Sequence, residues 1–271
     1  MLLTKAEAAA RQILVGSGID SIPALTSVKL KDLIQARGAY YEEIELDGKD
    51  GRIVTLKDRA VISINKFITD TGKKRFTAAH ELGHFELHKS LSVNADTPYE
   101  LCDWYQKGGH EKEANDFASE LLMPYKLFKQ ECEGKKFGPD LIEHLANTFI
   151  VSRTAVILKF VKAGNHPVCV FCSKDNKVKW WKMSEVMATM EHPFIPNFTR
   201  YKVKVSSKFP PPADSVAGQL MRSGNGRSND KCQEIEKSTW FVTHPNYDPP
   251  MFEYCNYVPQ YNFALSVVWE D

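Results

Sequence analysis

The chain has 271 residues, of which 43% are hydrophobic and 25% charged, which suits a soluble globular protein of one large domain or two modest ones. Its net charge of +1 excludes a global attraction to nucleic acid, and the lack of any apolar run near ~20 residues excludes a membrane span. The N-terminus lacks the apolar core of a secretion signal, and the six irregularly spaced cysteines do not form a disulfide framework, so we expect a cytoplasmic protein.

The first part of the chain is predicted to contain two helices followed by strands. The Ala-rich segment Thr4–Leu14 predicts one helix, and the apolar spacing within Ser27–Arg37 predicts a second. Alternating side chains predict a strand over Tyr40–Leu46, and the Gly- and Asp-rich segment Asp47–Gly51 predicts a turn. We therefore expect Arg52–Leu56 to return as the partner strand of a hairpin.

A further strand is predicted over Ala60–Asn65, and two interpretations of it stay open. At a sheet edge, its free backbone groups could pair with an extended peptide substrate. The alternative is a core strand with both edges covered by neighbouring strands.

The stretch Arg75–His88 contains the pattern His-Glu-x-x-His as His80, Glu81 and His84. Residues four apart lie on one face of a helix, so both imidazoles can bind a single metal ion. Glu81 is placed to hold a water on that ion and to take its proton, as in metal-dependent hydrolysis. The alternative is two structural histidines, but a buried carboxylate between two imidazoles is costly without a cation.

This helix is predicted to run from Thr77 to Lys89, with Thr77 as its N-cap. Residues 90–103 are predicted to form a loop. A second helix is expected to begin near Gly109 and to end or bend at Pro124.

A catalytic tetrahedral zinc site has three protein ligands and one position for a water. His80 and His84 supply two of these ligands, so a third is needed. The metzincin solution is excluded, because Ser90 stands where its third histidine would be and Leu87 where its glycine would be. His88 lies about 12 Å beyond His80 along the same helix, so it cannot bind the same ion, and we expect a supporting or structural role for it.

The third ligand is therefore sought on the following helix, where Glu111 and Glu113 compete. Helical phase places Glu111 on the face of Asn115 and Ala118, so a ligand and an amide that supports the site would project together. Small side chains on that face would also let the two helices approach closely. Helical phase and the small neighbouring side chains favour Glu111 as the third ligand, with Glu113 as the alternative.

The motif HELGH at 80–84, followed by EKEANDFASELLMP at 111–124, resembles the ImmA/IrrE family of metallo-endopeptidases. The likeness extends from the N-terminus to about Gly164. It implies that His80, His84 and Glu111 are zinc ligands, with Glu81 as the catalytic base. It also implies a cytoplasmic bacterial or phage protein that inactivates a helix-turn-helix repressor by cleavage. We expect one zinc ion, with Mn²⁺ as the alternative.

Residues 139–164 are predicted to form two short helices around a tight turn at 149–152, the spacing of a helix-turn-helix. The outward residues are predicted to be Arg153, Lys159 and Lys162, too few for firm binding to phosphates. Two helices that complete a peptidase core explain the same pattern, and we do not expect direct DNA binding.

The composition changes after residue 167, and short strands separated by Pro-, Gly- and Asn-rich links predict a mostly β domain. Residues Gly218–Gln233 are predicted to form a loop. Cys169 and Cys172 would point to opposite faces of a strand, which favours ordinary part-buried cysteines over a zinc site. The predicted strands are Val168–Phe171, Lys177–Lys182, Arg200–Val205, Thr239–Thr243 and Phe263–Trp269.

Together these features predict an α+β protein. A mainly helical, zincin-like peptidase domain over 1–164 would contain a small antiparallel sheet and the helix-turn-helix-like segment 139–164. A mostly β domain over 165–271 would recognise the substrate or sense a signal. The predicted function is zinc-dependent cleavage of a cognate helix-turn-helix repressor, which would derepress stress-response or mobile-element genes. The alternative is a non-catalytic, metal-containing interaction protein that binds a repressor or toxin partner.

Overall fold

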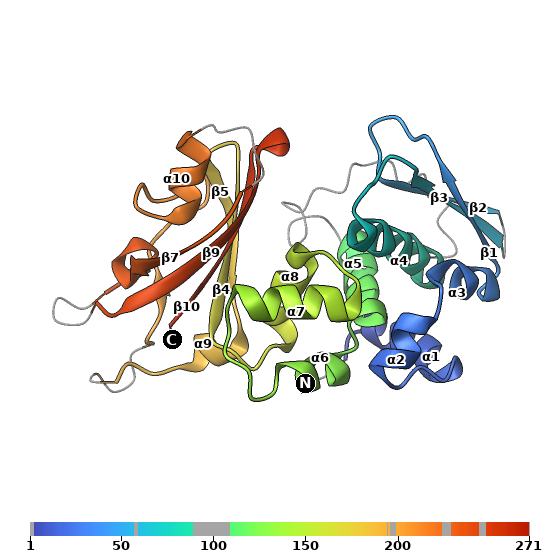
Figure 1. The fold of residues 1–271 in the computed structure, drawn as a ribbon, viewed down its shortest axis with the longest axis horizontal. Coiled ribbons are helices and arrows are strands. Elements are labelled where there is room, and N and C mark those ends of the chain that lie inside the picture. Colours follow the sequence, from blue (N-terminus) through green and yellow to red (C-terminus); the bar gives the residue numbers. More distant parts are fainter. Residues whose placement is uncertain are drawn as a thin grey trace. The chain divides into compact units, whose positions relative to one another are not determined.

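The computed structural model describes residues 3–56, 59–88, 109–193, 195, 199–223, 229–243 and 248–270 (Figure 1). The loop predicted over 90–103 lies outside these residues. The chain divides into two compact units, described separately below. The first unit comprises residues 1–131 and 144–155, and the second unit comprises residues 132–143 and 156–271.

The first unit begins with helices and contains the helices that carry the His-Glu-x-x-His motif and the acidic segment. Its first helix begins with a capping box, in which Glu7 N donates to Thr4 Oγ1 and Thr4 N donates to the Glu7 carboxylate. The helices are α1 (Lys5–Gly16), α2 (Ile22–Ser27), α3 (Leu30–Ala36), α4 (Thr71–Leu87), α5 (Gly109–Leu122) and, except for its last residue, α6 (Tyr125–Cys132).

The sheet of the first unit has three strands, β1 (Ala39–Ile44), β2 (Gly51–Leu56) and β3 (Arg59–Asn65), in the order β1-β3-β2. β3 pairs parallel with β1 and antiparallel with β2. The predicted hairpin between the first two strands is therefore wrong. β3 takes the centre because it is the most apolar of the three, and its residues Ile62 and Ile64 are fully buried.

The central position of β3 decides between the two interpretations of this strand. Both of its edges are covered, so the core-strand interpretation is confirmed and the edge-strand interpretation is wrong. Within the part of the chain that the structure describes, β2 has β3 as its only partner and is an edge strand.

Helix α4 begins six residues before the predicted N-cap. Asp70 caps it, with its Oδ1 accepting from Lys73 N at 2.5 Å. Thr77 lies inside the helix and is buried, and its hydroxyl donates to Lys73 O at 3.0 Å, so the predicted cap at Thr77 is wrong. Both side chains suit a cap, and the Asp70 carboxylate reaches the free N–H groups of the first turn.

Helices α4 and α5 lie side by side in the first unit (Figure 1). Their contact depends on small residues. A Cβ added to Gly83 would lie 3.1 Å from Ala114 Cα and 3.0 Å from Phe117 Cδ1. The predicted close approach of the two helices is therefore present, and it brings the first turn of α5 near the histidines of α4.

The helix-turn-helix-like segment consists of α7 (Pro139–Phe149) and α8 (Arg153–Ala163), and each of these helices is divided between the two units. Ile150 at the turn has a positive φ of 53°. Lys159 is buried, so its predicted outward position is wrong; residues 155–160 of α8 are all buried. Among the described residues, no single helix has the length and hydropathy of a membrane span, and α7 with α8 reach them only as a pair bent by 103°.

The second unit is built on an antiparallel five-stranded sheet in the order β5-β4-β10-β9-β7, with a separate two-stranded ladder of β6 and β8. Its strands are β4 (Val168–Lys174), β5 (Lys177–Met183), β6 (Lys202–Val203), β7 (Asn229–Glu236), β8 (Phe241–Val242), β9 (Pro250–Val258) and β10 (Phe263–Trp269). Its short helices are α9 (Glu185–Thr189), α10 (Val216–Ser223), η2 (Lys237–Thr239) and η3 (Pro259–Tyr261).

The loop predicted over Gly218–Gln233 is wrong at both ends, because α10 covers its start and β7 its end. Residues 224–228 lie outside the described part. The apolar face of α10 is short but buried, with Val216, Ala217, Leu220 and Met221 in the core of the second unit.

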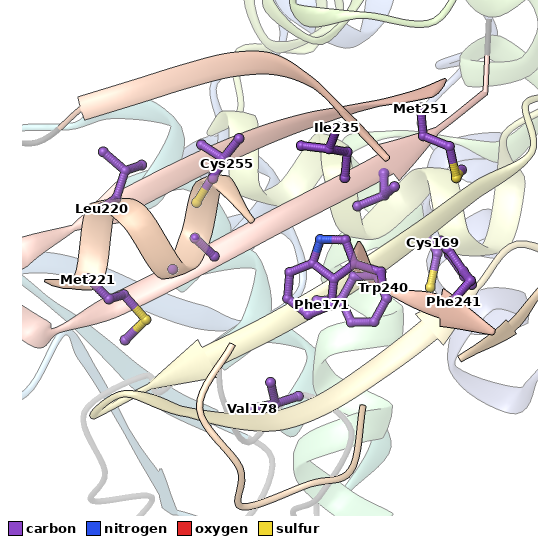
Figure 2. Packing of buried hydrophobic residues seen from close by; sticks show 14 of the residues in the cluster. Cys169, Phe171, Val178, Leu220, Met221, Ile235, Trp240, Phe241, Met251 and Cys255 are labelled. Carbon is purple, nitrogen blue, oxygen red and sulfur yellow. The ribbon is translucent and has the colours of Figure 1, made fainter. Parts of the chain in front are cut away.

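Figure 2 shows that core, in which Phe171 stacks on Trp240 with 4.0 Å between the ring centroids. Trp240 Nε1 also donates to Glu253 Oε2 at 2.9 Å. Cys169 and Cys172 are both buried, and neither forms a disulfide among the described residues. The predicted α+β class is confirmed, with one parallel strand pair in place of a wholly antiparallel first sheet. The domain boundary at 164/165 stays a prediction.

Candidate metal centre

Three side chains from α4 and α5 converge on one point in the first unit. His80 Nε2 and His84 Nε2 are 3.0 Å apart, and the Glu111 carboxylate oxygens lie 3.3 Å and 3.4 Å from these two nitrogens. Ligands that bind a tetrahedral ion at ~2.0–2.1 Å lie about 3.3 Å from one another. The three residues can therefore hold one metal ion.

The helical geometry explains this arrangement. His80 and His84 are one turn apart on α4, and both are buried. Glu111 lies in the first turn of α5, next to the close contact of Gly83 with Ala114. Hydrogen bonds from both imidazoles hold the pKa of the Glu111 carboxyl far below its ordinary value, so this group is ionised and able to bind a cation.

Asn115 supports one of the histidines. Its Oδ1 lies 2.8 Å from His80 Nδ1, and because a carbonyl oxygen only accepts, Nδ1 must carry the proton. With the proton on Nδ1, Nε2 is the nitrogen that can give its lone pair to an ion, in place of its contact with the Glu111 carboxylate. Asn115 was predicted to support the site beside Glu111, and the structure places it against His80.

Glu81 lies beside these residues without being one of the converging groups. Burial raises its pKa to about 8, and among the described residues its Oε2 has no hydrogen-bond partner. A divalent ion nearby would lower this pKa and favour the carboxylate. A buried carboxylate with a free oxygen is suited to accept a proton from a water in this site.

Gly51, the first residue of β2, was not predicted to matter. A Cβ at this position would lie 2.6 Å from Thr77 Cγ2 and 2.8 Å from Glu81 Oε1. The glycine therefore lets the edge strand lie against the Glu81 carboxylate. In the sequence, Gly51 is the last residue of a predicted turn, and nothing there separates it from an ordinary turn glycine.

The alternative third ligand, Glu113, faces a different group. Its Oε2 lies 3.3 Å from Nε2 of His88, at the end of α4. The structure thus brings Glu111 to His80 and His84, and separates Glu113 from them.

The donor set fits the metal that the sequence predicts. Two imidazole nitrogens and one carboxylate suit Zn²⁺, and a position stays open for a water or substrate. His84 Nδ1 is buried and has no hydrogen-bond partner among the described residues.

Comparisons with known proteins agree with this geometry. Residues 35–160 match the family model described as the IrrE N-terminal-like domain, which is a peptidase family. No curated protein matches the chain significantly. A solved structure of a Mycobacterium tuberculosis transcriptional regulator is similar, with 15% identity and a TM-score of 0.59 over 98% of this chain and 88% of that chain. At this identity the likeness shows a shared fold alone.

Proposed function

Because residues 35–160 form a domain of the IrrE N-terminal-like peptidase family, we propose that this protein is a zinc-dependent endopeptidase that cleaves a helix-turn-helix repressor. The observation that carries the proposal is Glu81. A metal site with a purely structural role has no use for a buried carboxylate that is not a ligand and has a free oxygen.

Each residue of the site has a separate role in the proposed peptide hydrolysis. An ion held by His80, His84 and Glu111 would supply a Lewis acid that polarises the scissile carbonyl and acidifies a water. Glu81 accepts the proton of that water at its free Oε2 and then donates it to the leaving amine. Asn115 keeps His80 in the tautomer whose Nε2 can bind the ion.

The edge strand β2 is the proposed binding site for an extended substrate. Its one partner in the described part of the chain is β3, so the N–H and C=O groups of its other edge can pair with a peptide. Gly51 lies next to Glu81, which places this edge near the proposed base. This role replaces the one that the sequence suggested for β3.

Selectivity for one protein needs a surface beyond that strand, because backbone pairing reads no sequence. We assign it to the second unit, whose sheet lies outside the matched residues 35–160 and which exposes the large apolar side chains Trp181 and Phe209. As a proposal, this unit recognises the repressor or senses the signal that permits cleavage. A repressor acts on DNA, so its peptidase would act in the same compartment, the cytoplasm.

The second candidate is a non-catalytic interaction protein that binds a repressor or toxin partner around a structural metal. The similar solved structure is described as a transcriptional regulator, which favours a role in gene control and leaves the chemistry open. Glu81 distinguishes the two candidates, because simple binding does not require it.

The deciding experiment incubates the purified full chain and Zn²⁺ with the helix-turn-helix regulator encoded beside its gene. We expect cleavage at one site, identified by mass spectrometry of the products, and none with the Glu81→Gln chain. Stable binding of the regulator without cleavage would support the interaction protein instead.

A further inference from the structure

A second group of metal-binding side chains lies one turn beyond the first, also on α4 and α5. His88 closes the C-terminus of α4, and His110 and Glu113 lie in the first turn of α5. Each of the three offers a ligand atom within 4.8 Å of those of the other two. The proposed peptidase mechanism uses none of them.

The distances within this group are close to those around a tetrahedral ion. Glu113 Oε2 lies 3.3 Å from His88 Nε2 and 3.9 Å from His110 Nδ1, and a single ion here would bind that Nε2, since the Nδ1 of His88 already contacts His110 Nδ1 at 3.1 Å. Ligands at ~2.0–2.1 Å from such an ion would be about 3.3 Å apart, and side-chain rotations can bring three atoms that already lie within 4.8 Å of one another to this spacing. Two imidazoles and a carboxylate favour Zn²⁺ and related transition ions over Ca²⁺ or Mg²⁺.

A second observation points to a ligand. The side chain of His88 is only 5% exposed, and its Nε2 is buried without a hydrogen-bond partner among the described residues, 3.3 Å from Glu113 Oε2. By contrast, the side chains of His110 and Glu113 are 63% and 40% exposed. The group therefore has a buried anchor and an open side, through which an ion can enter and water can complete its coordination.

The two groups are close but share no residue. His88 follows His84 by four residues on α4, so the two ions would lie about one helical turn, ~5 Å, apart. That is longer than the ~3.5–4 Å of two ions bridged by common ligands. Repulsion between two divalent ions at this distance makes the second ion bind more weakly than the first.

We propose that His88, His110 and Glu113 form a second site for a divalent transition ion, weaker than the first and independent of its ligands. The ion would tie the C-terminus of α4 to the N-terminus of α5. The competing interpretation is a hydrogen bond between His88 and His110 beside the Glu113 carboxylate, with no ion.

Titration of the full-length chain with Zn²⁺ in equilibrium dialysis tests this proposal, with Co²⁺ absorption as an independent probe of tetrahedral coordination. We expect two ions per chain. His110→Ala and Glu113→Gln should each weaken the second ion at least tenfold and leave the first in place. Because His110 is exposed, its replacement should not disturb folding. His144→Ala is the matched control, since this exposed histidine also lies 3.0 Å from a glutamate, Glu131, but in no such group among the described residues.

Several outcomes would overturn the proposal. If the protein binds only one ion at saturating Zn²⁺, then His88, His110 and Glu113 bind no ion. The proposal would also be wrong if the second ion bound His110→Ala or Glu113→Gln as tightly as the unmodified protein. It would be wrong as well if His144→Ala weakened that ion as much as these two substitutions do. Glu111→Gln separates the two sites, because it should weaken the first ion and retain the second. Loss of both ions in that variant would contradict an independent site.

Discussion

Asn115 on α5 and His80 on α4 are joined by a 2.8 Å contact between Oδ1 and Nδ1, and this contact makes one helix set the tautomer of a histidine on the other. Both residues are buried. The ability of the proposed metal centre to bind an ion therefore depends on the packing of α4 against α5 as well as on the ligands themselves.

Asn115→Ala should lower the affinity for the tightly bound metal ion by about 10–100-fold, because His80 loses the acceptor that fixes its proton on Nδ1. Asn115→Asp keeps an acceptor oxygen and should lose less. Competition with a chromophoric chelator measures both affinities. Equal affinity in the alanine variant and the unmodified protein would show that the contact does not support the ligand.

Glu111→Gln should strongly weaken the tight ion, because it removes the one anionic group of the His80, His84 and Glu111 set. Glu113→Gln should leave the tight ion in place, since this carboxylate faces His88. Elemental analysis after dialysis against a low concentration of Zn²⁺ compares the two. The reverse pattern would mean that the third ligand is misassigned.

Glu81→Gln should retain the fold and the tight ion but lose about 10²–10⁴-fold in cleavage rate, because an amide cannot accept the proton of the attacking water. Circular dichroism and metal content serve as the controls. Cleavage at the normal rate by a metal-loaded variant would rule out Glu81 as the base.

Gly51→Ala should reduce cleavage by about tenfold or more with little change in metal content, because the new Cβ collides with Thr77 Cγ2 and Glu81 Oε1. Adding Thr77→Ser removes the Cγ2 atom and should restore part of the rate. Gly16→Ala is the control, since a Cβ there meets nothing within 4 Å. If Gly51→Ala cleaves at the normal rate, the edge strand does not need this close approach.

Glu253 should make the stability of the second unit depend on pH. This buried carboxylate accepts from the N–H groups of Val216 and Ala217, from Trp240 Nε1 and from Ser266 Oγ. Burial nevertheless raises its pKa above the ordinary 4.5, so folding favours the protonated form. Its contribution to stability is complete below the ordinary pKa and is lost as pH rises through the raised one.

The melting temperature of the unmodified protein, relative to Glu253→Gln, should therefore fall as pH rises from 4.5 toward neutrality. Tryptophan fluorescence can follow the unfolding, because Trp180, Trp240 and Trp269 all belong to this unit. Glu234→Gln, at an exposed position of β7, is the control and should show no such trend. A constant difference across this range would contradict the raised pKa.

The features that sequence predicted well depend on local periodicity. Spacing on one helix placed His80 and His84 together, and helical phase on the next one selected Glu111, so their convergence needed only that the two helices pack. Strand order is not local. The turn after β1 suggested a hairpin, but the buried Ile62 and Ile64 made β3 the centre of the sheet.

Contacts between elements were the hardest to foresee. The meeting of His88 with His110 and Glu113 depends on the register of α4 against α5, which neither helix specifies alone. α10 was missed because its apolar face is short and lies among glycine and polar residues. The space that Gly51 leaves for Glu81 depends on a strand crossing a helix.

The order β1-β3-β2 has a consequence for how the chain acquires its structure. Neither outer strand can find its partner until synthesis has passed Asn65, whereas a hairpin of the first two could close within microseconds. The parallel pairing of Ala39 with Ala60 also closes a longer loop than a hairpin turn does. Helix α4 begins at Thr71, six residues after β3 ends at Asn65. The helix that carries the histidines is therefore synthesised just after the last strand of the sheet. An arrested nascent chain that ends before residue 59 should therefore expose both outer strands to proteases and chaperones.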